Sequence, residues 1–137
     1  MLKSVKVTDY MSRQLITLNA DTPLFAAIKI FSEHPVSGAP VLDKAGNLVG
    51  VMSEVYCLRG ILNKTYHKEE VGGTVGVFMT TKVDTVSGNT DMIAVAEKFI
   101  QRGRRRIPVV EDGKLIGQVS RKDILRAVHD FICKERH

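Results

Sequence analysis

Residues 107–120 read IPVVEDGKLIGQVS, and residues 39–53 read APVLDKAGNLVGVMS. Each stretch has an apolar run, a short polar segment with a glycine, and a second apolar run. This pattern predicts two strands joined by a hairpin turn. The two stretches differ in length by one residue, which falls in the turn. The chain therefore carries the same β-hairpin twice.

The repetition continues on both sides of the hairpin. Residues before the turn match at an offset of 68, and residues after it match at an offset of 67. The matched pairs include Met11-Ser12 with Met79-Thr80, Phe31 with Phe99, Pro40-Val41 with Pro108-Val109, Gly50 with Gly117, and Leu58-Arg59 with Leu125-Arg126. Because their order is kept along the chain, we interpret the sequence as two copies of one unit.

Each copy is predicted to fold as β-α-β-β-α. In repeat one we expect strands at 15–18, 39–42 and 48–52 and a closing helix at 53–62. In repeat two we expect strands at 83–86, 107–110 and 115–119 and a closing helix at 120–132. The first helix of each copy follows from apolar residues at helical spacing. We expect Asp21 or Thr22 to cap it in repeat one, with Pro23 in its first turn, and Asn89 or Thr90 to cap it in repeat two.

The expected fold class is α+β, a sandwich-like pair of repeats related by a pseudo-two-fold axis. We assign residues 1–65 to repeat one and residues 66–137 to repeat two. A linker is predicted at about residues 63–74, where Gly72-Gly73 interrupts the helical pattern. Neither repeat is large, so we expect the two to bury apolar faces against each other.

Composition and motifs argue against several classes of protein. No apolar run is long enough to cross a bilayer and no signal-peptide pattern opens the chain, so we expect a cytoplasmic protein with no membrane partner. Two cysteines without a CxxC and four histidines without ligand spacing predict neither a disulfide framework nor a metal site. No catalytic residue is predicted, since the motifs of common nucleotide-dependent and serine enzymes are missing from the sequence. The net charge of +5 suits an anionic ligand.

Ser120 and Asp123 stand where a predicted strand meets the start of a predicted helix. Unpaired backbone N–H groups there favour an anion or a hydroxyl-rich ligand, and a carboxylate can accept hydrogen bonds from both hydroxyls of a ribose. Ser-x-x-Asp is also a capping-box pattern, in which the two side chains bond only to their own backbone. Both interpretations remain open from the residues alone.

A run of three arginines, Arg104, Arg105 and Arg106, precedes the second strand of repeat two. Strand alternation would place Arg104 and Arg106 on one face and Arg105 on the other. The run either binds phosphate groups, or forms a solvated surface, or contacts acidic residues of a second copy. Arg121 at the start of the last helix is a further candidate for phosphate binding.

This order of elements and motifs resembles the cystathionine-β-synthase (CBS) domain, and two in tandem resemble a Bateman module. The motifs are Asp9-Tyr10-Met11-Ser12, Gly38-Ala39-Pro40-Val41-Leu42, Gly50-Val51-Met52-Ser53, Val77-Phe78-Met79-Thr80, Arg106-Ile107-Pro108-Val109-Val110 and Gly117-Gln118-Val119-Ser120-Arg121-Lys122-Asp123. The resemblance covers nearly the whole chain. It implies a free-standing, non-catalytic regulatory module that binds AMP, ADP or ATP, or alternatively S-adenosylmethionine or NAD, in a cleft between the repeats. It also implies a homodimer and an unidentified protein partner.

The resemblance further implies which residues form the site. Ser120 and Asp123 would bind ribose, and Arg105 and Arg106 would contact phosphates. The candidates for the adenine are Thr81, Lys82, Val83, Ile107 and Pro108. Val83 and Ile107 can also be interpreted simply as core residues.

Repeat one departs from this pattern. Tyr56 stands where Asp123 stands in repeat two, and the uncharged Val36-Ser37-Gly38 stands in place of the arginines. A tyrosine cannot accept two ribose hydroxyls as a carboxylate does. We therefore expect one competent site per chain, built mainly by repeat two; the alternative is that Tyr56 stacks on a base.

Two other functions remain alternatives. The first is a dimerisation or assembly module without a ligand. The second is a nucleic-acid-binding protein, suggested by the basic charge and disfavoured by an aromatic content of only 6%.

Overall fold

The two hairpins take their shape from turn residues with a left-handed backbone. The structure is a computed structural model that describes residues 4–67 and 73–135. In repeat two, β5 (Arg106–Glu111) and β6 (Lys114–Ser120) are joined by Asp112 and Gly113, whose φ angles are 50° and 81°. Two successive positive φ angles match the right-handed twist of the flanking strands. In repeat one, β2 (Gly38–Leu42) and β3 (Leu48–Ser53) are joined by the longer turn that Gly46 closes at φ 89°.

Each hairpin belongs to a three-stranded sheet. The short strand β1 (Leu18–Asn19) runs parallel to β2, and β4 (Val86–Ser87) runs parallel to β5. The strands predicted at 15–18 and 83–86 were therefore placed too early. Only the last predicted residue of each reaches a partner, because pairing is confined to the far ends of β2 and β5.

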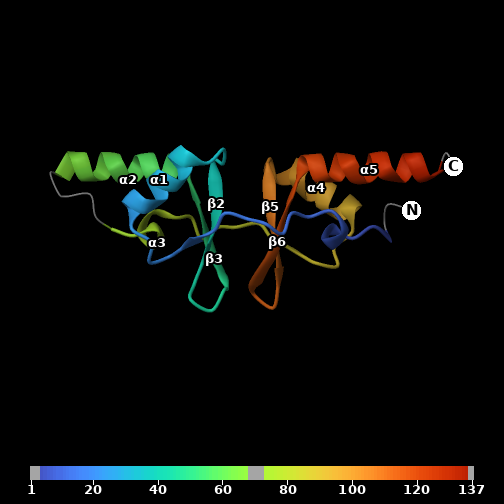
Figure 1. Ribbon diagram of the computed structural model, residues 1–137, viewed down its shortest axis with the longest axis horizontal. Helices are drawn as coiled ribbons and strands as arrows, with labels where there is room; N and C mark the ends of the chain where they lie inside the picture. The colour runs from blue at the N-terminus through green and yellow to red at the C-terminus, as the bar shows by residue number, and fades with distance from the viewer. Residues whose placement is uncertain (1–3, 68–72, 136–137) are drawn as a thin grey trace. The chain divides into compact units, whose positions relative to one another are not determined.

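Two helices accompany each sheet (Figure 1). In repeat one they are α1 (Leu24–Glu33) and α2 (Glu54–His67), and in repeat two α4 (Met92–Arg102) and α5 (Arg121–Glu135). Helix α2 continues through residues 63–67, which the sequence had assigned to the linker, and residues 68–72 lie outside the described residues. A short helix α3 (Val75–Phe78) follows. None of the helices in the described ranges combines the length and the apolar character needed to span a bilayer.

The predicted helix caps were wrong by one or two residues. Helix α1 has Pro23 at its N-cap and no side-chain cap, while Thr22 accepts a hydrogen bond from the backbone of Asn19. Helix α4 is capped by Asp91, which accepts from the N–H of Ala94 at 2.9 Å. The polar residues ahead of each helix form hydrogen bonds within the preceding turn. The cap of α4 is therefore left to Asp91, and no side chain caps α1.

The chain divides into two compact units that do not follow the boundary between the repeats. One unit comprises Ile16–Val83, and the other comprises Met1–Leu15 together with Asp84–His137. The boundary between residues 65 and 66 is a prediction about the sequence repeats, whereas in space the segment before each repeat belongs with the other repeat. Thus the helical turn η2 (Val7–Asp9) packs with repeat two, and α3 packs with repeat one.

The same pair of hydrogen bonds attaches each exchanged segment. Ser12 exchanges backbone hydrogen bonds of 2.8 and 2.9 Å with Gln118 on β6. Thr80 exchanges bonds of 3.0 and 2.9 Å with Val51 on β3. Gly117 precedes Gln118, and Gly50 precedes Val51. A Cβ at Gly117 would lie only 2.8 Å from the carbonyl oxygen of Ser12. Glycine therefore permits this close approach of two backbones.

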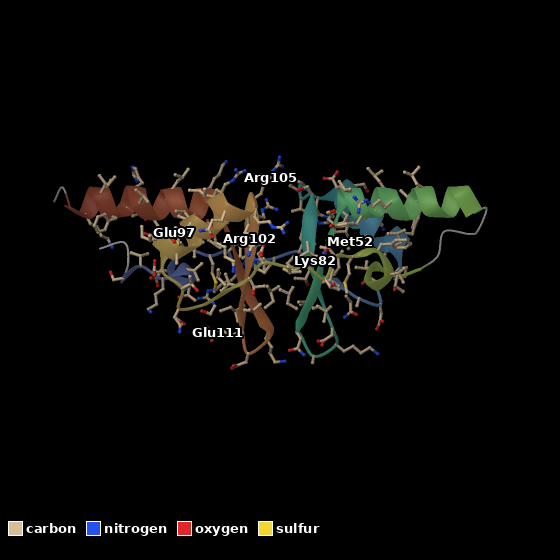
Figure 2. The ribbon with its side chains drawn as sticks, turned by 180° about the vertical axis from the view of Figure 1, so that it is seen from behind. Met52, Lys82, Glu97, Arg102, Arg105 and Glu111 are labelled. Atoms are coloured by element: carbon tan, nitrogen blue, oxygen red, sulfur yellow. The ribbon has the colours of Figure 1, made fainter. Side chains whose placement is uncertain are left out.

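Each unit has its own apolar core. The core around repeat one includes Leu24, Ala27, Val41, Met52 and Val75, and Met52 is labelled in Figure 2. The core around repeat two includes Val7, Met92, Val95, Ile107 and Val119. Because Val7 and Val75 come from the exchanged segments, each core is completed by residues that precede the other repeat.

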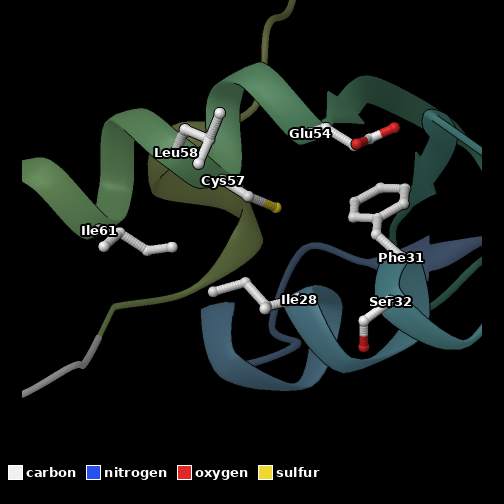
Figure 3. A pocket seen from close by; sticks show the side chains of 7 residues that line it. All are labelled: Ile28, Phe31, Ser32, Glu54, Cys57, Leu58 and Ile61. Atoms are coloured by element: carbon white, nitrogen blue, oxygen red, sulfur yellow. The ribbon is translucent and has the colours of Figure 1, made fainter.

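A cavity of about 210 Å³ lies between α1 and α2 of repeat one (Figure 3). Its lining is mostly apolar, and the lining residues are Ile28, Phe31, Cys57, Leu58 and Ile61 together with the polar Ser32 and Glu54. Burial raises the pKa of the Cys57 thiol, and the nearby Glu54 carboxylate adds to this effect. The other cysteine, Cys133, is exposed on α5.

The substitution Gly117→Ala is expected to lower the free energy of unfolding by about 1–3 kcal/mol, because overpacking forces neighbouring atoms apart. The added methyl group would meet the Met11 sulfur and the backbone oxygen of Ser12. Since the oxygen cannot rotate away, the exchanged segment must shift. Urea unfolding followed by circular dichroism measures the effect. Gln118→Ala, which keeps the backbone bonds to Ser12, serves as the control and should change stability by less than about 0.5 kcal/mol. Equal stability of Gly117→Ala and the parent would contradict the close approach.

The two cysteines are expected to react with a thiol reagent in two well-separated phases. The thiolate is the reactive form, so a raised pKa and burial both slow Cys57 at pH 8. Cys133 should react first and Cys57 only as the protein opens, and raising the pH should speed the slow phase. Stopped-flow absorbance with Cys133→Ser and Cys57→Ser assigns the phases. A fast reaction of Cys57 in the folded protein would show that the cavity wall is open.

Candidate functional site

Ser120 and Asp123 form a reciprocal capping box at the junction of β6 and α5. The backbone N–H of Ser120 donates to Asp123 Oδ2 at 2.8 Å, and the N–H of Asp123 donates to Ser120 Oγ at 3.3 Å. Of the two interpretations of this pattern, the cap is thus present. The cap uses only one acceptor position of the Asp123 carboxylate, whose two oxygens offer about four.

Arg126, one turn along α5, approaches the second oxygen of the same carboxylate. Its Nη2 lies 3.4 Å from Asp123 Oδ1, and the Asp123 side chain is only 13% exposed. The carboxylate is therefore held from two sides in a fixed orientation, with acceptor positions remaining on both oxygens. Such an acceptor can receive the two hydroxyl groups of a ribose.

Arg106 lies directly opposite Ser120, across the pair of strands β5 and β6. Together with Arg105 and Arg121 it is exposed, and none of these three arginines has an ion-pair partner among the described residues. Figure 2 labels Arg105, where the chain enters β5. The strand begins only at Arg106, so the predicted alternation of faces does not extend to Arg104.

Arg104 is instead engaged by an acidic residue. Its Nε donates to Asp84 Oδ2 at 2.9 Å, and Arg102 Nε lies 3.7 Å from Asp84 Oδ1. The hydrogen bond from Arg104 is the main cause of the lowered pKa of Asp84. Asp84 was not singled out in the sequence, since 20 positions separate it from Arg104 and no local pattern connects them. Arg102 and Arg104 are thereby neutralised in part, whereas Arg105 and Arg106 are not.

The residues expected around the adenine belong to two different compact units. Ile107 is fully buried in the core of repeat two, as its core interpretation predicts, and Pro108 is also buried. Thr81, Lys82 and Val83 end the compact unit that contains repeat one. Thr81 and Lys82 are exposed, and the N–H of Lys82 donates to Thr80 Oγ1 at 3.2 Å. Within one unit the structure thus brings together Arg106, Ser120 and Asp123, with Arg105, Ile107, Pro108 and Arg121 adjacent in the chain.

The matching junction of repeat one has the same backbone and different chemistry. The N–H of Tyr56 donates to Ser53 Oγ at 3.3 Å, which repeats one half of the capping box. Gly38 lies opposite Ser53, where repeat two has Arg106 opposite Ser120. The guanidinium of Arg59 lies over the Tyr56 ring, 5.3 Å from its centre. This junction therefore presents an aromatic ring where repeat two has the Asp123 carboxylate.

Metal ligation has no support in the described residues. They contain no group of three or more His, Cys, Asp or Glu side chains that could hold an ion. On α5 the Cys133 Sγ lies 3.8 Å from His129 Nε2, but no third ligand joins them among these residues.

The sequence and the fold of this chain are similar to those of known proteins. The sequence model of the CBS domain matches residues 7–63 and 73–130. The chain is 32% identical over 130 residues to an A-adding tRNA nucleotidyltransferase from Aquifex aeolicus, an alignment that covers 95% of this chain and 15% of that enzyme. The chain spans 41% and 34% of two further curated relatives, both from Methanocaldococcus jannaschii.

Two solved structures with bound ligands share the fold. The crystal structure of CBSX2 from Arabidopsis thaliana in complex with AMP has a TM-score of 0.79 at 32% identity, and the match covers 93% of this chain and 98% of that chain. The CBS domain pair of protein MJ0100, in complex with 5′-methylthioadenosine and S-adenosyl-L-methionine, has a TM-score of 0.72 at 25% identity, covering 92% and 97%. The α+β fold class expected from the sequence is confirmed. Matched in sequence along both repeats, this chain belongs to the CBS domain family and carries two CBS domains in tandem.

Proposed function

We propose that this CBS pair is a non-catalytic regulatory module that binds an adenine nucleotide at the start of α5. The observation that carries the proposal is the Asp123 carboxylate, which is held by Ser120 and Arg126 and retains free acceptor positions. A related CBS pair of similar fold has been solved with AMP, and another with adenosyl compounds. All of these ligands share an adenosine, whose ribose hydroxyls Asp123 would accept.

The charge around Asp123 favours a ligand with phosphate groups. Arg106 lies opposite Ser120 in the strand pair, and Arg121 follows Ser120 in the chain. Arg105 directly precedes Arg106. These guanidinium groups can form charge-assisted hydrogen bonds with phosphate oxygens. S-adenosylmethionine carries a cationic sulfonium and no phosphate, so the same arginines would disfavour it. We therefore rank AMP, ADP and ATP ahead of S-adenosylmethionine, with NAD as a further phosphate-bearing candidate.

Regulation would follow from a difference in affinity. A ligand shifts a protein between two conformations only by as much as it binds one of them more tightly. We propose that the bound nucleotide stabilises one conformation of the CBS pair and that a protein partner recognises it. The partner, a cytoplasmic location, and the adenine contacts of Thr81, Lys82, Val83 and Pro108 remain predictions from the sequence.

AMP, ADP or ATP is expected to raise the midpoint of thermal unfolding, and Asp123→Asn is expected to abolish the increase. A ligand that binds only the folded state adds about 2.7 kcal/mol of stability at a hundredfold excess over its Kd. Differential scanning fluorimetry with each nucleotide, NAD and S-adenosylmethionine measures the shift. Because Asp123→Asn also weakens the helix cap, the ligand-induced shift is compared and not the midpoint itself.

Tyr56→Ala is the matched control for Asp123→Asn, because Tyr56 occupies the equivalent position in repeat one. The control should keep the nucleotide-induced shift if repeat two supplies the site. Loss of the shift in Tyr56→Ala alone would move the site to repeat one. If none of these ligands shifts the parent, the proposed nucleotide site is wrong and Ser120 and Asp123 act only as a cap.

A second candidate function, assembly of two copies, is supported by exposed apolar side chains on one helix of each unit. On α2, Val55, Leu58 and Leu62 recur at helical spacing with exposures of 55, 58 and 67%. On α5, Leu125 and Ile132 are exposed to 68 and 47%. Exposed apolar residues grouped on one helix mark a surface that another protein covers. We propose that a second copy of this chain covers the exposed apolar side chains of both helices, which gives the homodimer expected from the sequence.

The double substitution Leu58→Asp with Leu125→Asp is expected to convert a dimer into a monomer. A carboxylate on each of the two helices would have to be buried without a partner, at a cost of several kcal/mol. Sedimentation equilibrium measures the mass. Val77→Asp, which changes an equally exposed apolar residue on α3, is the control and should remain dimeric. A monomeric parent protein would contradict the homodimer.

A further inference from the structure

Arg126 contacts two residues, Asp123 and Tyr10, that lie far apart from each other in the sequence. Besides Asp123, its Nη2 donates to the backbone oxygen of Tyr10 at 3.0 Å, 116 positions away. Its guanidinium also lies over the Tyr10 ring, 5.4 Å from the centre. A planar guanidinium can donate a hydrogen bond in its plane while its flat face stacks on a ring, whereas a lysine ammonium has no flat face to stack. One side chain therefore connects the start of α5 with the N-terminal segment.

The N-terminal segment, residues 4–12, is attached to repeat two along its whole length. Val7 is fully buried, and its N–H donates to the oxygen of Thr90 at 2.9 Å. The Tyr10 hydroxyl donates to Asp130 Oδ2 at 2.8 Å, and this bond is the main cause of the raised pKa of Tyr10. Ser12 ends the segment with its two backbone bonds to Gln118 on β6. Movement of Tyr10 would thus disturb both the segment and the guanidinium that lies on it.

We infer that Arg126 is a positioning residue that couples a ligand on Asp123 to the docking of the N-terminal segment. The inference rests in part on the proposed function. Arg126 holds Asp123 Oδ1 while the Ser120 N–H holds Oδ2, so the carboxylate keeps one orientation. The same guanidinium keeps that place only while Tyr10 is docked beneath it. Coupling between two binding events is reciprocal, so a ligand that favours the held carboxylate also stabilises the docked segment.

Repeat one has an arginine equivalent to Arg126 but no acidic residue equivalent to Asp123. Arg59 matches Arg126 in the repeat, and its guanidinium lies over Tyr56, the residue that stands in place of Asp123. Phe78, without a hydroxyl, stands in place of Tyr10. Arg59 therefore has the same position on its helix but no carboxylate to orient. This makes Arg59→Gln a matched control for Arg126→Gln.

The test combines AMP binding with hydrogen exchange of the full chain. Isothermal titration calorimetry should show AMP binding to Arg126→Gln about fivefold or more weaker than to the parent, the lower end of typical coupling between sites. Arg59→Gln should stay within about twofold, as expected for a surface change away from the site. AMP should slow exchange at the Ser12 and Gln118 amides of the parent, and this slowing should vanish in Arg126→Gln. Arg126→Lys, which keeps the charge but not the planar group, should recover only part of both effects.

Each outcome decides one of the two proposals. If AMP binds Arg126→Gln as tightly as the parent, or leaves exchange at Ser12 unchanged, the coupling through Arg126 is wrong and the nucleotide site stands. If the parent binds none of AMP, ADP, ATP and NAD, the nucleotide proposal fails, and the coupling is judged without ligand. Asp123→Asn should then speed exchange at Ser12 in the parent but not in the Arg126→Gln background. Equal effects of Asp123→Asn in both backgrounds would overturn the coupling.

Discussion

Two backbone hydrogen bonds between Ser12 and Gln118, repeated between Thr80 and Val51, are the interaction on which the other features depend. They attach the segment that precedes each repeat to the sheet of the other repeat. The backbones approach so closely that a Cβ at Gly117 or Gly50 would lie 2.8 or 2.7 Å from a carbonyl oxygen. A carbonyl in a ladder cannot rotate away without losing its bond, so glycine is required at both positions.

The exchange of segments also determines the surroundings of the proposed ribose acceptor. Because the N-terminal segment is attached beside α5, Tyr10 lies under Arg126, and Arg126 in turn reaches Asp123. The capping box and the ligand site, which the residues alone presented as alternatives, are compatible here. A carboxylate has more acceptor positions than one cap and one guanidinium occupy. The cap orients the group, and the remaining lone pairs are available to a ligand.

The two repeats show how one backbone can carry different chemistry. Both hairpins have a register shift at the same place, and both junctions place a serine before the closing helix. Around these equivalent serines, repeat two has a carboxylate and unpaired arginines, whereas repeat one has Tyr56 and Gly38. Asp84 forms ion pairs with Arg102 and Arg104. Arg105 and Arg106 have no acidic partner among the described residues, so their positive charge adds to the contrast with repeat one. Packing depends on the apolar residues that the repeats share, and binding depends on the polar residues that they do not.

The sequence by itself determined the repeat, the hairpins, the closing helices and the family, because these follow from local turn chemistry and from patterns that occur twice in register. It also pointed to Ser120, Asp123 and Arg106 as candidate site residues, and these share one strand pair and the helix turn beside it. Only the tertiary structure decided which segment completes which repeat, where the helix caps fall, and which partners Asp84, Tyr10 and Arg126 find. The contact of Asp84 with Arg104 joins residues 20 positions apart, and those of Tyr10 with Arg126 and Asp130 join residues 116 and 120 positions apart. No local pattern encodes contacts that depend on how the whole chain is packed.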